Sequence, residues 1–123
     1  MQFDMTGYAK NNDPTVWISD NGTYQHTDKD LTAYALKLVA AYVKKPAKIT
    51  TLSDESDHWS WAEAGYKTVF PMESDCHASS ECPRREHTNK DTMDKLSLSH
   101  MTDYLKLAIA FAVELAEPIN SYS

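Results

Sequence analysis

Hydrophobic and polar residues follow two different periods along the chain. Short runs rich in β-branched and aromatic residues, which favour strands, occur at 1–6, 15–19, 48–52 and 67–72. Apolar residues three or four positions apart, the helical period, occur at about 28–44 and 98–116, and the shorter segment 56–65 is also typical of a helix. This order predicts α/β layers, with a largely parallel sheet of about four strands covered by three helices.

Capping residues and apolar stripes predict how the helices begin, end and pack. Thr27 is the expected N-cap of the first helix, with lysines and Pro46 at its end. Ser56 is the expected cap of the short helix, and Gly65 is expected to close it. The two long helices each carry one apolar stripe at helical spacing, formed by Leu31, Ala35, Leu38 and Tyr42 in the first and by Leu98, Met101, Leu105, Ala108, Ala112 and Leu115 in the second.

Composition excludes two classes of partner. The 123 residues suffice for one domain, and 41% hydrophobic with 24% charged residues is ordinary for a globular chain. The net charge of −6, without a basic cluster, argues against nucleic-acid binding. No apolar run approaches the roughly 20 residues that span a bilayer, and no basic region precedes an apolar run at the N-terminus, so a signal peptide is not expected.

The two cysteines, Cys76 and Cys82, lie in the polar segment "CHASSEC". Two cysteines cannot build a four-cysteine zinc site. They are either free thiols or a small disulfide loop, and the loop-like sequence favours the disulfide. A disulfide would imply an oxidising compartment.

Two residues stand out as candidates for metal binding. Asp4 interrupts the apolar run "QFDMT", and a buried carboxylate is costly unless it is paired or binds a metal. A strand-end aspartate that bonds a neighbouring loop is the simpler alternative. His87 lies on the long polar segment 73–96, where a histidine is usually just solvated. Asp and His are both zinc ligands, but two ligands do not complete a site.

Three short motifs in order carry a family resemblance: "MQFDMTGY", "SDHWSWAEAGYKTVFPMES" and "PRREHTNKDT". Together they resemble the C-terminal half of secreted bacterial leucyl aminopeptidases, which are zinc-dependent exopeptidases with two co-catalytic metals. The resemblance covers essentially the whole chain. It implies that residues 1–123 form the C-terminal half of a zinc aminopeptidase catalytic domain, a three-layer α/β sandwich whose complete mixed sheet has eight strands.

The resemblance also assigns roles to individual residues. Asp4 would bind one zinc and His87 the other, and the substrate would be a peptide with a free N-terminus. The triplet Ser56, Asp57 and His58 would support the site. The pocket for the substrate's first side chain would be lined by Met5, Ile18 and Phe70. The parent enzyme would be secreted or periplasmic. Cys76 and Cys82 would form a disulfide at a different position from the one found in the family.

The chain departs from the family at two places. In the family the other metal ligands and the glutamate general base lie upstream of "DMT", and this chain begins three residues before Asp4. It is therefore expected to hold part of the dizinc site, to contain no catalytic base and to be inactive alone. The segment Thr51–Glu55, "TLSDE", also replaces a Cys-Gly-Tyr-x-Cys element, so the tyrosine that helps to hold the reaction intermediate is absent.

Two alternative functions stay open. A glutaminyl-cyclase-like enzyme has the same fold and would use one zinc, and a non-catalytic α/β binding module would bind none. Separately, an apolar strand at 1–6 would form an unpaired sheet edge, and unpaired edges promote association. Self-association through this edge is therefore expected.

Overall fold

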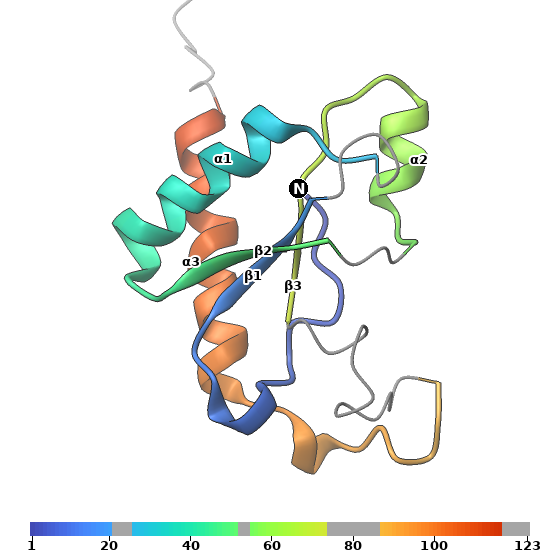
Figure 1. The fold of residues 1–123 in the computed structure, drawn as a ribbon, viewed down its shortest axis with the longest axis vertical. Coiled ribbons are helices and arrows are strands. Elements are labelled where there is room, and N and C mark those ends of the chain that lie inside the picture. Colours follow the sequence, from blue (N-terminus) through green and yellow to red (C-terminus); the bar gives the residue numbers. More distant parts are fainter. Residues whose placement is uncertain (21–25, 52–54, 74–86, 117–123) are drawn as a thin grey trace, which may run out of the picture.

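The computed structural model describes residues 1–20, 26–51, 55–73 and 87–116 (Figure 1). Its sheet contains β1 (Val16–Ser19), β2 (Ala47–Thr50) and β3 (Phe70–Met72), in the order β2-β1-β3. β1 runs parallel to β2 and antiparallel to β3, so the sheet is mixed. Three of the four predicted strands are thus confirmed. β1 and β3 lie within the predicted residues, and β2 begins one residue before its predicted range, at Ala47.

Helices cover both faces of this sheet. Successive side chains of a strand point to opposite faces, and Val16 and Ile18 point toward α1 (Lys29–Leu38) and α3 (Leu98–Leu115). Phe70 pairs with Ser19 and therefore lies on the other face, where its ring stacks on His58 of α2 (His58–Glu63) with centroids 4.3 Å apart. Figure 1 shows α1 and α3 together on one side and α2 on the other. The predicted α/β sandwich is confirmed.

Tyr104 connects α3 to two strands. Its hydroxyl donates to the Met72 carbonyl and accepts from the Trp17 backbone N–H at 3.1 Å. Burial raises the pKa of the Tyr104 phenol, so the hydroxyl keeps its proton and remains a donor. The buried core around it contains Val16, Leu38, Val39, Val43, Leu107 and Ala110.

The ends of the first long helix differ slightly from the prediction. Asp28, not Thr27, is the N-cap, and its carboxylate accepts from the Leu31 N–H at 2.9 Å. The helix continues as a π-helical turn, Val39–Val43, which ends where Lys44 adopts a left-handed φ of 58°. Leu38 and Ala35 are buried as predicted, whereas Tyr42 is half exposed.

Residues 1–6 do not form the predicted strand. The Gln2 N–H donates to the Val69 carbonyl at 3.0 Å, but the segment is not part of the sheet. Met1 and Phe3 instead pack, partly buried, against the hydrophobic core. The strand prediction failed because apolar composition alone does not supply a pairing partner. Residues 1–6 therefore offer no strand edge through which two copies could pair. Self-association stays a prediction, but this edge no longer supports it.

The apolar stripe predicted for the last helix points outward. Leu98, Met101, Leu105, Ala112 and Leu115 are exposed, and of the six predicted positions only Ala108 is half-buried. The buried side of α3 contains His100, Asp103, Tyr104, Leu107 and Ala110. Within the described segments, no helix is long and apolar enough to cross a membrane.

Candidate metal and substrate site

Asp4 lies exposed at the surface, next to α2. Its Oδ2 accepts a hydrogen bond from the Ser56 hydroxyl at 2.9 Å, and the Ser56 oxygen accepts from Gln2 Nε2 at 3.3 Å. Ser56 was predicted to cap the short helix, but Asp57 occupies that position and its side chain makes no capping bond. Ser56 instead orients the Asp4 carboxylate, and its predicted role in supporting a metal site stays a prediction.

The turn that follows Asp4 is held by Glu73, which the sequence analysis did not single out. Glu73 Oε2 accepts from the backbone N–H groups of Gly7, at 2.9 Å, and Tyr8, at 2.7 Å. Met5, directly after Asp4, has a left-handed φ of 51°, a conformation that costs a non-glycine residue free energy and is common at functional sites. The only indication of this role in the sequence was the position of Glu73, an acidic residue directly after a buried strand.

His87 is also exposed and also has a left-handed φ, 62°. It begins a compact segment in which Asp91 N–H donates to the Thr88 carbonyl at 3.2 Å. The segment continues through a 3-10 turn, Met93–Lys95, to α3. Both residues that the resemblance assigned to metals are thus solvent-accessible donors, and zinc accepts both donor types.

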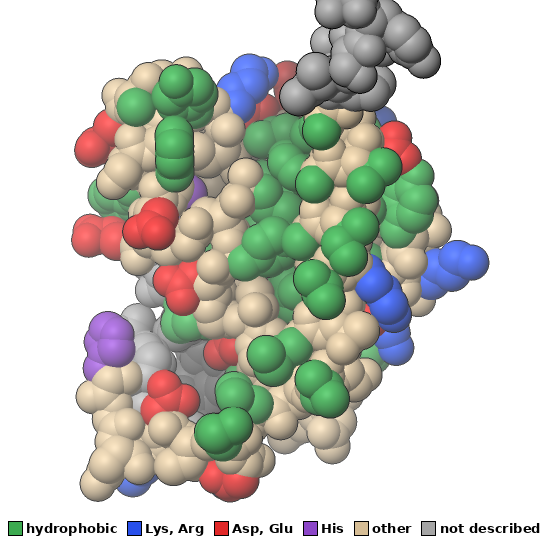
Figure 2. All heavy atoms as spheres, turned by 180° about the vertical axis from the view of Figure 1, so that it is seen from behind, with side chains coloured by type: hydrophobic (Ala, Val, Ile, Leu, Met, Phe, Trp, Pro, Cys, Tyr) green, Lys and Arg blue, Asp and Glu red, His purple; other side chains and the backbone are tan. Residues whose placement is uncertain are grey.

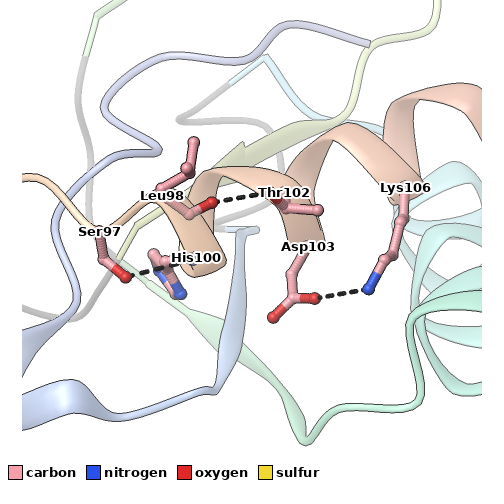
Figure 3. Close-up of polar contacts among 6 residues, drawn as sticks. All are labelled: Ser97, Leu98, His100, Thr102, Asp103 and Lys106. Atoms are coloured by element: carbon pink, nitrogen blue, oxygen red, sulfur yellow. Dashed lines mark hydrogen bonds and ion pairs between the residues drawn. The ribbon is translucent and has the colours of Figure 1, made fainter.

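The segments that carry Asp4 and His87 meet at Gly7 and Leu96. Tyr8 forms an isolated antiparallel bridge with Leu96, and the Ser97 N–H donates to the Gly7 carbonyl at 2.7 Å. A Cβ at Gly7 would lie 2.8 Å from Leu96 Cδ2, so a larger residue there would displace the Leu96 side chain. Ser97 is the N-cap of α3 and accepts from the His100 N–H at 3.3 Å (Figure 3). The start of α3 therefore fixes the two segments relative to each other.

His100 extends this connection to Glu73. The His100 side chain is buried, and its Nε2 lies 3.3 Å from the Glu73 carbonyl oxygen. One turn further along α3, the buried Asp103 pairs with Lys106 at 3.3 Å (Figure 3). His100 therefore joins the first turn of α3 to Glu73, whose carboxylate accepts from the Gly7 and Tyr8 N–H groups.

The other predicted site residues differ in their exposure. Ile18 and Phe70 are fully buried, and Met5 is half-buried, so their predicted role in a substrate pocket stays a prediction. His58 is buried against Phe70, whereas Asp57 is exposed. Beside Gln2 and His58 the surface is hollowed by a pocket of about 370 Å³, whose other lining residues are Met1, Trp61, Tyr66, Lys67 and Thr68.

The described residues contain no group of three or more His, Cys, Asp or Glu side chains able to hold a metal ion. The predicted Cys76–Cys82 disulfide lies outside the described residues, in 74–86.

Comparison with known proteins identifies the family of this chain. Residues 1–112 match the model of Peptidase family M28, and the chain belongs to this family. It is 33% identical to Leucine aminopeptidase 1 of Coccidioides posadasii over 118 residues, which cover 94% of this chain and 30% of that protein. Leucine aminopeptidase 1 of Penicillium rubens is 34% identical with the same coverage.

Solved structures agree. The Legionella pneumophila LapA aminopeptidase superposes with a TM-score of 0.82 and 40% identity, covering 97% of this chain and 31% of LapA. LapB of the same organism gives a TM-score of 0.75 and 34% identity, covering 89% of this chain and 29% of LapB. The chain thus spans about 30% of the length of the relatives that it matches.

Proposed function

We propose that this chain is part of the catalytic domain of a zinc-dependent aminopeptidase, which removes N-terminal residues from peptides. The observation that carries the proposal is the exposed Asp4 carboxylate, which Ser56 orients on a turn held by Glu73. This arrangement lies in a chain that matches aminopeptidases over nearly all of its length. In the proposal, Asp4 binds one zinc ion and His87 binds the other.

The residues of this chain would hold and orient the metals. One Asp4 oxygen accepts from Ser56, so the other can bind a cation. When bound, zinc would polarise a peptide carbonyl and lower the pKa of a coordinated water. A hydrolytic zinc usually keeps three protein ligands, and the described residues hold no such set. The remaining ligands and the general base would come from the rest of the domain, so we expect this chain alone to be inactive.

The aminopeptidase is favoured over the two alternatives. The two fungal relatives and LapA carry aminopeptidase in their names, which supports a peptide hydrolase over a glutaminyl cyclase or a non-catalytic module. Export of the parent enzyme and oxidation of Cys76 and Cys82 belong to the same proposal, and thiol titration of the denatured secreted protein would test them.

A chimera tests the proposed function. In LapA, the segment aligned with this chain is replaced by this chain, and hydrolysis of a leucyl chromogenic peptide is measured with added zinc. We expect hydrolysis by the chimera and none by the isolated chain. Asp4→Asn and His87→Ala should each lower the rate at least about 100-fold, since even supporting residues of a metal site are worth 10–100-fold.

The matched control is Asp30→Asn, which makes the same chemical change on the exposed side of α1. It should leave the rate unchanged. Full activity of the Asp4→Asn and His87→Ala chimeras, or turnover by the isolated chain, would contradict the proposed roles.

A further inference from the structure

Glu73, directly after β3, makes hydrogen bonds in two directions. Its side chain reaches the turn after Asp4, where Oε2 accepts from the backbone N–H groups of Gly7 at 2.9 Å and Tyr8 at 2.7 Å. Its backbone carbonyl oxygen lies 3.3 Å from Nε2 of the buried His100, on the first turn of α3. A carbonyl can only accept, so His100 Nε2 donates this hydrogen bond. One half-buried residue therefore contacts both the turn after Asp4 and the start of α3.

These contacts belong to a closed ring of hydrogen bonds. The His100 N–H donates to the Ser97 hydroxyl at 3.3 Å (Figure 3), and the Ser97 N–H donates to the Gly7 carbonyl at 2.7 Å. The four members, here called the Glu73 ring, are Gly7, Glu73, His100 and Ser97. Each member is bonded to two others, so a displacement of one member is passed on to its neighbours in the ring.

Both proposed metal ligands lie on segments that meet at the Glu73 ring. Asp4 lies three residues before Gly7. His87 begins the segment that leads to Ser97, and this segment is folded by internal backbone hydrogen bonds and a 3-10 turn. The ring is therefore the point at which the position of Asp4 is set relative to that of His87.

The turn between Asp4 and the ring contains a costly backbone conformation. Met5 has a left-handed φ of 51°, which a non-glycine residue keeps only where the surrounding structure imposes it. The N–H groups of Gly7 and Tyr8 follow closely, and their hydrogen bonds to one carboxylate oxygen are strong because they are charge-assisted. Loss of the Glu73 carboxylate would let Met5 relax and would shift the backbone that carries Asp4.

We propose that Glu73 is a positioning residue of the aminopeptidase site, which holds Asp4 and His87 in the relative position that metal binding requires. Ser56 orients the side chain of Asp4, whereas Glu73 fixes the backbone on which that side chain is carried. Glu73 Oε2 already accepts from two N–H groups, so Glu73 acts through the two ligands. The inference rests on the proposed function, because it takes Asp4 and His87 as zinc ligands.

The test changes Glu73 in the LapA chimera described above. Glu73→Ala deletes the acceptor, Glu73→Gln keeps a neutral acceptor oxygen, and the control Glu63→Ala removes a carboxylate from exposed α2. A second control, Leu38→Ala, lowers stability from the buried core without touching the ring. Zinc affinity is measured by competition with a chelator, and kcat and KM are measured with the leucyl peptide, at a temperature where every variant is folded.

Glu73→Ala should weaken zinc binding about 10–100-fold, the usual effect of losing a residue that supports metal ligands. It should lower kcat more than it changes KM, because it displaces the metal ligands and leaves the substrate contacts in place. Glu73→Gln should recover most of both losses, whereas Glu63→Ala and Leu38→Ala should leave zinc affinity and kcat unchanged. Unchanged zinc affinity and kcat in Glu73→Ala, or an equal loss in Leu38→Ala, would overturn the inference.

A second readout needs neither metal nor turnover. In this chain without added metal, Glu73→Ala should accelerate amide hydrogen exchange at Ser97 as well as at Gly7 and Tyr8, although the Ser97 N–H donates to Gly7. Acceleration confined to Gly7 and Tyr8 would show that the ring does not couple the two segments and would also overturn the inference. A parent chimera that neither binds zinc nor hydrolyses the peptide would contradict the proposed function itself, whereas an active parent with a fully active Glu73→Ala variant would contradict this inference alone.

Discussion

The helices α1 and α3 lie side by side over the same face of the sheet, but their outward sides differ in chemistry. The outward side of α1 carries Lys29, Asp30, Ala33 and Lys37 and no large exposed hydrophobic residue. The outward side of α3 carries five exposed hydrophobic residues (Figure 2), here called the outer stripe: Leu98, Met101, Leu105, Ile109 and Val113. The inward sides are alike, since both contribute to one buried core. The two helices therefore differ in their outward sides, and α3 is apolar on both sides whereas α1 is apolar on one.

Their first turns also differ. α1 begins beside Lys67 and Thr68, where Asp28 pairs with Lys67 at 3.0 Å and its N–H donates to the Thr68 carbonyl. α3 begins at the candidate site, through the contact of Ser97 with Gly7 and of His100 with Glu73. α3 therefore connects the candidate site at one end to the outer stripe along its length.

The largest expected effects on the free energy of unfolding come from the inward sides of the two helices, where truncation of a buried side chain should cost a similar amount in each. Leu38→Ala in α1 and Leu107→Ala in α3 each remove a buried side chain and should lower the free energy of unfolding by about 2–5 kcal/mol. Leu105→Ala on the outer stripe should change it by no more than about 0.5 kcal/mol in the isolated chain. Urea denaturation measures all three. If Leu105→Ala costs as much as Leu107→Ala, the outer stripe is already covered and the comparison fails.

An intermediate effect on the free energy of unfolding is expected for Glu73, which connects α3 to the candidate site. Glu73→Ala leaves the Gly7 and Tyr8 N–H groups without their acceptor and should cost about 1–3 kcal/mol. Amide hydrogen exchange at these two residues should accelerate. Glu73→Gln keeps an acceptor oxygen and should restore most of the protection, and Glu63→Ala on exposed α2 is the control. Unchanged exchange at Gly7 and Tyr8 in Glu73→Ala would show that the turn does not depend on this carboxylate.

The smallest effects concern the N-caps, which differ in their response to pH. Asp28→Ala and Ser97→Ala should each cost about 1 kcal/mol at neutral pH. The pKa of Asp28 is lowered, first by the hydrogen bond from Leu31 N–H and then by Lys67. Because the folded pKa lies below the unfolded one, near 3.9, the stabilisation by Asp28 is complete above the unfolded pKa and is lost as pH falls through the folded pKa.

The stabilisation by the neutral Ser97 hydroxyl should not depend on pH. Urea titrations near pH 7 and near pH 3 separate the two caps. Equal losses for Asp28→Ala at both pH values would contradict the assignment of a charged cap.

The sequence predicted most elements because each has a local signal. The cores of β1, β2 and β3 lie in β-branched or aromatic runs, and α3 begins and ends within a residue of its prediction. Residues 1–6 were wrongly predicted as a strand, because a strand needs a neighbouring strand to pair with and the local sequence does not show whether one is present. The direction of the α3 stripe was not predictable because apolar residues occur on both sides of this helix, and only tertiary packing selects the inner one.

The candidate site was predictable only where side chains carry the chemistry. Asp4 and Ser56 were both selected, by an acid in an apolar run and by the family resemblance, and the structure brings them into contact. Glu73 was missed because it acts on backbone N–H groups, which leave no pattern in the sequence of their own residues. His100 was missed because it is buried only by the packing of α3 against the residue that follows β3, which the local sequence does not show.

Zinc content of the LapA chimera tests the central claim most directly, because it counts metals independently of turnover. In the proposed function this chain supplies one ligand to each of two zinc ions. We therefore expect two bound zinc ions per parent chimera and the loss of about one in each of Asp4→Asn and His87→Ala, with two retained in Asp30→Asn. Two zinc ions retained in both ligand variants, measured by elemental analysis after dialysis, would contradict the claim.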